Sequence, residues 1–497
     1  MDIARNRFGE LFEALSLSTD ESEPLHRRLY GELRQAIVSG RVTPGSRLPS
    51  SREFARNLGL SRNTVNTALA QLIAEGHVRS ISGSGIFVAD GASPRTALSR
   101  NPNSPRPRSR ASISPARRAE SFTGGSDLLA ALRHRHGSSF QPFRIGVPSV
   151  ADFPLDLWRR LAARTYRRIP PRDLGDTDPA GLPRLRQAII GYLKAARGID
   201  CELEQLIATA GSQQALDLVV RVTTDPGDTV MMEDPGYFGT SGCFRAAGAH
   251  LQGLPVDAQG MSLPSRGRHA PPRLIYCTPS SQMPLGIPMT HARREALLDF
   301  AQRQGTWIIE DDYDSEYRYD SRPLPTLYAL CRTDHVIYMG AFSKTLFPGL
   351  RIGYAIVPPD LVEPITVMRL LTSWHPPVFE QHALAEFIES GEFARHVRRS
   401  RARYRERAEA IYEAGRKWLP PSHAIIRPAS GLTTLMRAPE NEDHEARIAA
   451  AMRRGIELSP LAMFAPDHRP SPGYVLGFAP FDPDALWHAV RRLGELL

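Results

Sequence analysis

A lysine stands in the stretch "MGAFSKTLFPGLRIGY" (residues 339–354), just after an apolar run and seven residues before Arg351. Lysine is rare in this chain: Lys194, Lys344 and Lys417 are the only three among 62 lysine and arginine residues. A primary amine can form a Schiff base with an aldehyde, whereas a guanidinium cannot. The amine at position 344 therefore predicts carbonyl chemistry, the alternative being a surface lysine with no special role.

Three other side chains fit this chemistry if the aldehyde belongs to pyridoxal phosphate. Asp311 ends the apolar stretch "WIIED", where a sheet collects its ligands, and its carboxylate could keep the pyridine nitrogen protonated. Tyr313 follows two residues later and could donate a hydrogen bond to the phenolic oxygen. Tyr237, in "EDPGY", could offer a face on which the ring stacks.

The phosphate of this cofactor needs amide groups and a cation. The stretch "TAGSQQAL" turns from a strand into a helix, where backbone amides and the helix dipole favour anions. Arg351 adds a charged donor. Each signal alone also fits a plain role as a loop, a helix cap or a core edge. Together they predict a pyridoxal phosphate site formed by Gly211, Ser212, Gln213, Tyr237, Asp311, Tyr313, Lys344 and Arg351.

Strands and helices alternate from about residue 140 to the C-terminus. The segments "LIATA", "RLIYCTPS", "TWIIEDDYD" and "HVIYMGAFSK" are typical of strands, and "TVMMEDPGY" of a strand and loop. The segments "GSQQALDLVVRVT" and "HARREALLDFAQRQG" are typical of helices. Near-continuous apolar strands between helices indicate a mostly parallel sheet covered on both faces. A long helix over residues 392–418 then leads to a smaller mixed region.

Residues 24–90 predict three short helices and a hairpin, the pattern of a winged helix-turn-helix. The helices cover residues 25–39, about 51–57 and 62–75, and Ser-Gly-Ser-Gly joins strands 77–81 and 86–89. Ser50 or Ser51 can cap the second helix, and Ser61 the third. The apolar stripes of the first and third helices are Leu25, Leu29, Leu33, Ile37, Val65, Leu69 and Leu72.

The third of these helices begins with side chains that can read DNA. A recognition helix contacts base edges with residues near its N-terminus, and arginine pairs with guanine as asparagine does with adenine. Arg52, at the start of the preceding helix, is placed for a phosphate, and the glycine-rich wing tip lets the backbone approach DNA closely. The predicted DNA-binding residues are Arg52, Ser61, Arg62, Asn63, Thr64, Asn66 and Gly83.

The net charge of +9 is concentrated near the N-terminus. Residues 24–90 contain nine arginines against four acids, and residues 91–125 contain seven against one. This surplus predicts a polyanionic partner. The second stretch is also rich in proline and serine, as linkers are, and its arginines either contact DNA phosphates or keep the linker solvated. No apolar run is long enough for a membrane span, and four widely spaced cysteines indicate a reducing cytoplasm.

The stretch "SGRVTPGSRLPSSREFARNLGLSRNTVNTALAQLIAEGHV" resembles the GntR-type winged helix. Residues from about 140 to 497 resemble a fold-type I aminotransferase, and "EDPGY", "TPSSQMPLG", "EDDYDSEYRY" and "FSKTLFPGLRIGY" resemble the MocR/GabR/PdxR regulators, in which the two are fused. The resemblance implies an internal aldimine at Lys344 and a domain-swapped homodimer. The expected organisation is a tail (1–23), a winged helix (24–90), a linker (91–140) and an α/β aminotransferase-like effector and dimerisation domain (141–497).

Three positions depart from the patterns of the resembled families. Met283 stands where active aminotransferases carry the asparagine of Asn-Pro-Thr-Gly. Ala341 replaces a threonine or serine three residues before the lysine, and Asp176 replaces a tyrosine. The first change removes a donor to the cofactor and the second a phosphate contact. Cofactor binding is therefore expected, while catalytic turnover stays open.

The preferred hypothesis is a cytoplasmic regulator whose operator binding responds to an amino compound or to pyridoxal phosphate at Lys344. The alternatives are a working aminotransferase with a DNA-binding head, and a DNA-binding protein whose aminotransferase fold only dimerises. The resemblance also implies arginines that hold the carboxylate of an ω-amino acid. One such position here is Gly239, and the segment "LSPLAMFAP" contains no arginine, so the effector is not expected to be GABA.

Overall fold

The computed structural model describes residues 23–89, 141–263, 271–319, 324–465 and 472–497. The chain divides into two compact units, Met1–Ile113 and Ser114–Leu497. The predicted linker and, apart from residue 23, the predicted tail lie outside the described residues. Below, residues 23–89 are called the head, and the described residues from 141 onward the large domain.

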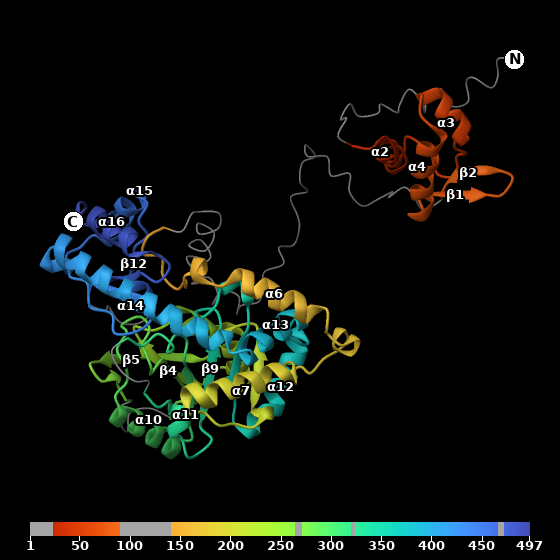
Figure 1. Cartoon of the computed structure of the whole chain (residues 1–497). Helices are drawn as coiled ribbons and strands as arrows, with labels where there is room; N and C mark the ends of the chain where they lie inside the picture. The colour runs from red at the N-terminus through yellow and green to blue at the C-terminus, as the bar shows by residue number, and fades with distance from the viewer. Residues whose placement is uncertain (1–22, 90–140, 264–270, 320–323, 466–471) are drawn as a thin grey trace, which may run out of the picture. The chain divides into compact units, whose positions relative to one another are not determined.

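The head consists of three helices and a two-stranded antiparallel hairpin (Figure 1). These elements are α2 (Leu25–Val38), α3 (Ser51–Leu58), α4 (Arg62–Ala74), β1 (Val78–Ile81) and β2 (Gly85–Val88). The predicted caps are confirmed: the Ser50 hydroxyl accepts from the Glu53 amide, and the Ser61 hydroxyl accepts from the Thr64 amide. Gly59 ends α3 with φ 66°, a left-handed conformation that glycine adopts without strain.

The core of the head is formed by the apolar stripes of its helices. Leu29, Leu33, Phe54, Val65 and Leu69 are at most 2% exposed. One predicted member of the first stripe was wrong. Leu25 is the first residue of α2, lies outside the core cluster of the head and is 46% exposed.

The large domain is built on an eight-stranded sheet in the order β3-β10-β9-β8-β7-β4-β5-β6. Neighbours from β9 to β5 pair in parallel, and β10 is antiparallel to both β9 and β3. The predicted mostly parallel sheet is thus confirmed. The strands are β3 (Leu206–Thr209), β4 (Thr229–Asp234), β5 (His250–Asp257), β6 (Gly260–Met261), β7 (Leu274–Cys277), β8 (Trp307–Asp311), β9 (Val336–Ala341) and β10 (Gly353–Ile356).

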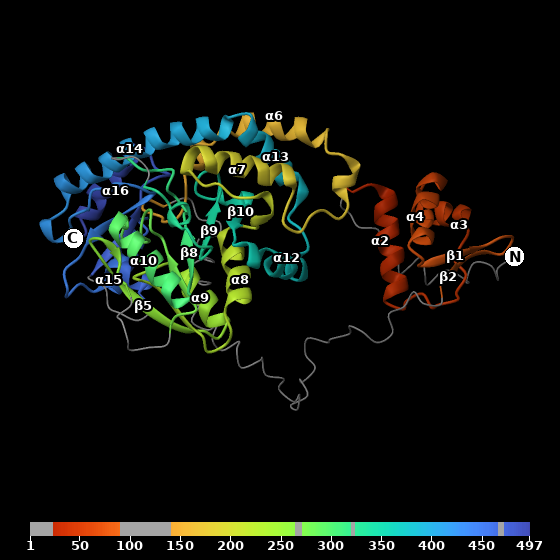
Figure 2. The same ribbon diagram turned by 90° about the horizontal axis from the view of Figure 1, so that it is seen from below.

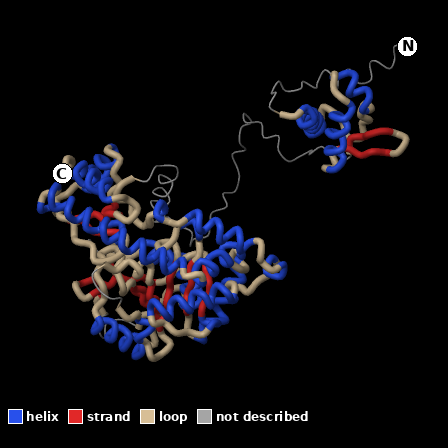
Figure 3. Tube along the Cα trace, viewed as in Figure 1, coloured by secondary structure: helices blue, strands red, loops and turns tan. Residues whose placement is uncertain are grey.

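Helices cover both faces of this sheet (Figures 2 and 3). Alternate residues of β9 show the two sides: Ile337 and Met339 pack with α8 and α12, whereas Val336 packs with α10 and Tyr338 with α7 and α13. Burial on both faces explains why the strands are apolar almost throughout. The helices are α6 (Leu155–Tyr166), α7 (Pro183–Arg197), α8 (Ser212–Thr223), α9 (Phe238–Ala246), α10 (His291–Gln304), α11 (Leu327–Leu330), α12 (Pro359–Ser373) and α13 (Val378–Glu389).

A long helix, α14 (Glu392–Trp418), leads to a smaller C-terminal layer, as predicted. That layer contains a second sheet in the order β11-β13-β12, and α16 packs along α14. Its remaining elements are β11 (Thr433–Arg437), α15 (His444–Arg453), β12 (Ser459–Pro460), β13 (Gly473–Gly477) and α16 (Pro483–Gly494). The first described residues of the large domain contact this layer, since Phe143 forms an antiparallel β-bridge with Gly477 of β13.

Candidate functional site

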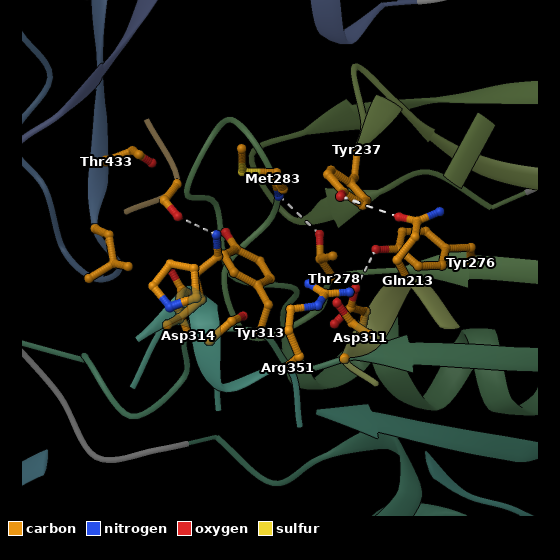
Figure 4. Close-up of a pocket in the computed structure, with 17 residues that line it drawn as sticks. Gln213, Tyr237, Tyr276, Thr278, Met283, Asp311, Tyr313, Asp314, Arg351 and Thr433 are labelled. Carbon is orange, nitrogen blue, oxygen red and sulfur yellow. Dashed lines mark hydrogen bonds between the residues drawn. The ribbon is translucent and has the colours of Figure 1, made fainter. Parts of the chain in front are cut away.

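A cavity of ≈ 230 Å³ opens where strands of the large sheet end (Figure 4). Strand β8 ends beside it at Asp311, the loop after β9 contributes Lys344, and α8 begins at it. All eight residues predicted to hold a cofactor line this one cavity, although they come from segments up to 140 positions apart: Gly211, Ser212, Gln213, Tyr237, Asp311, Tyr313, Lys344 and Arg351.

The amine of Lys344 lies against the backbone of a distant segment. Its Nζ donates to the carbonyl oxygen of Gly146 at 2.6 Å. Gly146 has φ 76°, and a Cβ there would lie 3.2 Å from Nζ. A side chain at position 146 would therefore be strained and would crowd the amine. The lysine is held at the cavity wall by main chain.

Asp311 is the last residue of β8 and is only 6% exposed. The hydroxyl of Tyr276 donates to its Oδ2 at 2.7 Å, and its buried Oδ1 has no hydrogen-bond partner in the described structure. Burial raises the pKa of this carboxyl to about 6. A buried carboxyl oxygen without a partner is costly, so Oδ1 is suited to receive a proton donor from a ligand.

The turn before α8 forms a positively polarised end of the cavity. Gly211 precedes the helix with φ 100°, and a Cβ at this position would lie 3.4 Å from the guanidinium of Arg351. The first amides of a helix lack partners within the helix, and its dipole is positive there. Glycine at 211 thus allows the arginine and the amides of Ser212 and Gln213 to share one anion-binding corner.

Two tyrosines complete the predicted set. Tyr237 lines the cavity next to Gln213, whose Oε1 lies 3.4 Å from the tyrosine hydroxyl, and burial raises the pKa of Tyr237 to about 12. Tyr313 donates its hydroxyl proton to the carbonyl oxygen of Ser281 at 3.0 Å. Its hydroxyl oxygen can still accept, while donation to a ligand would replace the Ser281 bond.

The residues present fit pyridoxal phosphate. An amine, a carboxyl with an unpartnered oxygen, an anion-binding corner and an aromatic wall face the same cavity. Each matches a different part of the cofactor: aldehyde, ring nitrogen, phosphate and ring face.

Several residues of the site were missed in the sequence. Tyr276, which holds Asp311, lies inside an ordinary apolar strand, and the role of Gly146 is carried by its carbonyl oxygen. Glu233 was also missed: it is fully buried and accepts from the amide and hydroxyl of Thr278, and burial raises its pKa to about 7. The only available signal for Glu233 was a charged residue within the apolar strand "TVMMED".

The three departing positions differ in their relation to the cavity. Met283 lines it, and its amide donates to the Thr278 hydroxyl at 3.0 Å. Ala341 ends β9 and is not among the lining residues. Asp176 is exposed and accepts from the indole of Trp374 at 3.2 Å. Of the three, Met283 alone changes a side chain that faces the cavity.

Neither expected carboxylate-holding position supplies a cation. At Gly239 a Cβ would lie 2.5 Å from the ring of Tyr237 and 2.6 Å from the Gln213 side chain, so any side chain there would displace the cavity wall. The segment containing Leu461–Phe464 lies beside it, since the Phe464 carbonyl accepts from the Gly236 amide at 2.7 Å. Its described residues include no arginine.

Six of the seven predicted DNA-binding residues are exposed on the head, and Thr64 is half-buried. Arg62 and Asn63 lie in the first turn of α4, Asn66 lies one turn after Asn63, and all three are exposed. Arg52 is exposed at the start of α3, and Gly83 has φ 77° at the hairpin tip. Ser61 and Thr64 differ, because their hydroxyls bond each other at 2.8 Å and cap the helix.

Comparison with known proteins agrees with this architecture. Residues 25–88 match the family model "Bacterial regulatory proteins, gntR family", and residues 155–468 match "Aminotransferase class I and II". The chain is 39% identical to the probable rhizopine catabolism regulatory protein MocR of Rhizobium meliloti, over 96% of this chain and 95% of that protein. It is 30% identical to the pyridoxine biosynthesis transcriptional regulator PdxR of Corynebacterium glutamicum, over 97% and 98%.

A solved structure matches the large domain. The α-aminoadipate aminotransferase LysN of Thermus thermophilus, complexed with N-(5'-phosphopyridoxyl)-L-leucine, aligns with a TM-score of 0.69 and 29% identity, over 76% of this chain and 97% of that one. A winged helix fused to an aminotransferase-like domain defines a class of helix-turn-helix transcription regulators. The chain belongs to the MocR-type GntR regulators. No helix among the described residues is long and apolar enough to span a membrane.

Proposed function

We propose that this regulator binds pyridoxal phosphate in the large domain, and that an amino compound or the cofactor itself changes its affinity for operator DNA. The observation that carries the proposal is the convergence of the eight cofactor-binding candidates on one cavity. When bound, the cofactor would supply an electrophilic aldehyde through which amines are recognised. The operator would be contacted by the exposed residues of α4, α3 and the wing in the cytoplasm.

Different residues of the cavity would bind different parts of the cofactor. Lys344 would present its amine to the aldehyde in place of its present bond to Gly146. Asp311 would accept the ring nitrogen proton at its unpartnered oxygen, and this ion pair would favour the ionised carboxylate against the effect of burial. Gly211, Ser212 and Arg351 would receive the phosphate, and Tyr237 would cover the ring.

A homodimer that exchanges heads between subunits is part of the proposal. Large apolar side chains are exposed on and around α12, namely Val367, Leu371, Trp374 and Phe379. Leu371 is 76% exposed. Exposed apolar side chains that are grouped in this way mark surfaces that bind another molecule. A second copy would cover such a surface, and light scattering of the purified protein tests this.

The test of the proposed function uses the full-length protein. After loading with pyridoxal phosphate and removal of free cofactor, a visible absorption band should remain with the protein. Footprinting of the promoter region of its own gene should then show protection that changes when cofactor or a candidate amine is added. A protein that retains no cofactor, or whose protection ignores every addition, would contradict the proposal.

A working aminotransferase is the second candidate, because Lys344, Asp311 and Tyr313 all face the cavity. Met283 argues against it, since its thioether cannot donate a hydrogen bond to the cofactor. Formation of keto acid from an amino acid with 2-oxoglutarate would favour this candidate. A protein that only dimerises through this fold would show no retained absorption band.

A further inference from the structure

One part of the cavity is left over once the cofactor is assigned its residues. The remaining wall includes Gly146, Met283, Asp314, Pro348, Leu432 and Thr433. In Figure 4, Asp314 and Thr433 lie on the opposite side of Tyr313 from Tyr237 and Gln213. Apart from Lys344, whose amine bonds the Gly146 carbonyl oxygen, Asp314 carries the one charged side chain among the residues lining this part. We call it the Asp314 side of the cavity.

Asp314 is buried there without full hydrogen bonding. Its side chain is 3% exposed, and Oδ1 has no hydrogen-bond partner in the described structure. It also packs closely on Gly431, where a Cβ would lie 2.6 Å from Oδ2 and φ is 76°. The chain thus bends tightly around a carboxyl group that it does not fully satisfy. Such an arrangement is costly unless something else bonds the carboxyl.

The surrounding charges describe what could bond it. Burial raises the pKa of Asp314 well above its usual range, as do the charges of Glu316 and Asp312, while Lys344 acts in the opposite direction. Lys344 is assigned to the cofactor, and Arg351 stands at the other end beside Gly211. On the Asp314 side a ligand carboxylate could receive hydrogen bonds from the Thr433 hydroxyl and from the protonated Asp314 carboxyl, but no cation among the lining residues is left to pair with it. Most of the cost of removing its charge from water would therefore remain.

We propose, building on the proposed function, that Asp314 recognises a hydrogen-bond donor on the effector, and that the effector is therefore an amine bearing a hydroxyl or second amino group and no carboxylate. Oδ1 supplies the acceptor that such a donor needs. Met283, Pro348 and Leu432 provide an apolar wall for the carbon skeleton. This assigns a ligand class to the Asp314 side of the cavity.

The test titrates the cofactor-loaded full-length protein with four amines of similar length: 1-aminobutane, 4-aminobutan-1-ol, 1,4-diaminobutane and 4-aminobutanoate. The concentration that half-completes the change in the visible band is measured for each. The hydroxyl or second amino compound, or both, should act at concentrations about tenfold lower than 1-aminobutane, the typical value of one added hydrogen bond. The compound that gains identifies which donor is bound. 4-Aminobutanoate should be the weakest.

The Asp314→Leu variant removes both carboxyl oxygens at similar side-chain volume, so it should abolish this preference, while the response to 1-aminobutane changes less than about threefold, since that amine has no group to lose. Asp217→Leu, at a partly exposed position paired with Arg221, is the control for replacing a carboxylate by an apolar side chain. The ranking in the unmodified protein tests the proposal even if Asp314→Leu does not fold. Tighter binding of 4-aminobutanoate than of all three other amines would overturn it, and so would equal responses to all four. A protein that retains no cofactor would instead overturn the proposed function, and this inference with it.

Discussion

The two candidate interfaces of this regulator are built in opposite ways. In the head, Arg62, Asn63 and Asn66 are exposed on α4, and the core beneath them is formed by other residues. In the large domain, Asp311 and Asp314 are at most 6% exposed, within the packed interior. Function and stability are therefore separable in the head and coupled in the large domain. Substitutions should show this difference.

The largest effect is expected for Lys344→Ala. The visible band and the ligand response should disappear completely, because alanine offers no amine to the aldehyde. DNA binding without ligand should persist, since the head has its own core. Absorption spectra and gel-shift titrations measure both properties.

Lys194→Ala is the matched control, because Lys194 is an exposed lysine of α7 that pairs with Asp200. It should retain both the band and the response. Loss of both in the control, or their retention in Lys344→Ala, would show that the cofactor is not held at Lys344.

Asp311→Asn should separate stability from cofactor binding. The pKa of Asp311 is raised to about 6 in the folded protein from 3.8, so between these pH values the folded state binds more protons than the unfolded state. The free energy of unfolding of the cofactor-free protein should therefore fall as the pH rises through this range, by about 3 kcal/mol for this group. In the variant the free energy of unfolding should fall by about 3 kcal/mol less over this pH range, because asparagine does not titrate.

The same variant should bind pyridoxal phosphate more weakly by about 1.5–3 kcal/mol, the range for a hydrogen bond to a charged group. Urea unfolding at several pH values and cofactor titration measure the two effects. Identical pH dependence in variant and parent would mean that Asp311 is ionised alike in the folded and unfolded states.

Arg62→Ala should weaken binding to the specific operator by about 1–3 kcal/mol if Arg62 contacts a base. Thermal unfolding of the head should hardly change, because this side chain is exposed. Arg106 and Arg108, outside the described residues, should behave differently on replacement by alanine. They should weaken binding to operator and random DNA alike and reduce the salt dependence. If Arg62→Ala lowered the affinity for operator and random DNA equally, Arg62 would contact only phosphate.

Ser61→Ala should have the smallest effect, and it should lower the stability of the head rather than act through a DNA contact. Ser61 caps α4 through the Thr64 amide, so its loss should destabilise the head by about 1 kcal/mol. Thermal unfolding of the isolated head measures the loss. Asn63→Ala, two residues after the cap in the first turn of α4, is the exposed control. A larger loss of stability in the control than in Ser61→Ala would contradict the assignment of Ser61 to capping and of Asn63 to DNA contact.

Features that depend on neighbouring residues in the sequence could be predicted, and contacts between distant segments could not. Asp311 ends a strand, Gly211 lies in a strand-to-helix turn, and Lys344 follows the end of β9 by three residues. A strand end is visible in the sequence as the point where an apolar run stops. Helix caps such as Ser61 are equally visible, because capping uses a few residue types at fixed spacing. These features depend on neighbours in the sequence, so local patterns were sufficient to predict them.

Contacts between distant segments could not be predicted in this way. Tyr276 has the same apolar surroundings as any strand residue, and only the parallel pairing of β7 with β8 places its hydroxyl at Asp311. Asp314 was read as part of a motif, although its burial depends on Gly431, 117 positions later. Leu25 was misplaced for a related reason, since spacing along a helix does not show where the neighbouring helices end.

The bond between Lys344 and Gly146 has one more consequence. Its acceptor is a peptide carbonyl, which every residue type possesses, so no substitution at position 146 removes the acceptor itself. The bond ends when the Lys344 amine turns to another partner, and the Gly146 carbonyl, in a backbone with φ 76°, then loses its hydrogen bond from Nζ. Gly146 also lies six residues after position 140, where the chain enters the large domain. A change at the Lys344 nitrogen thus leaves a main-chain carbonyl, rather than a side chain, in need of a new partner.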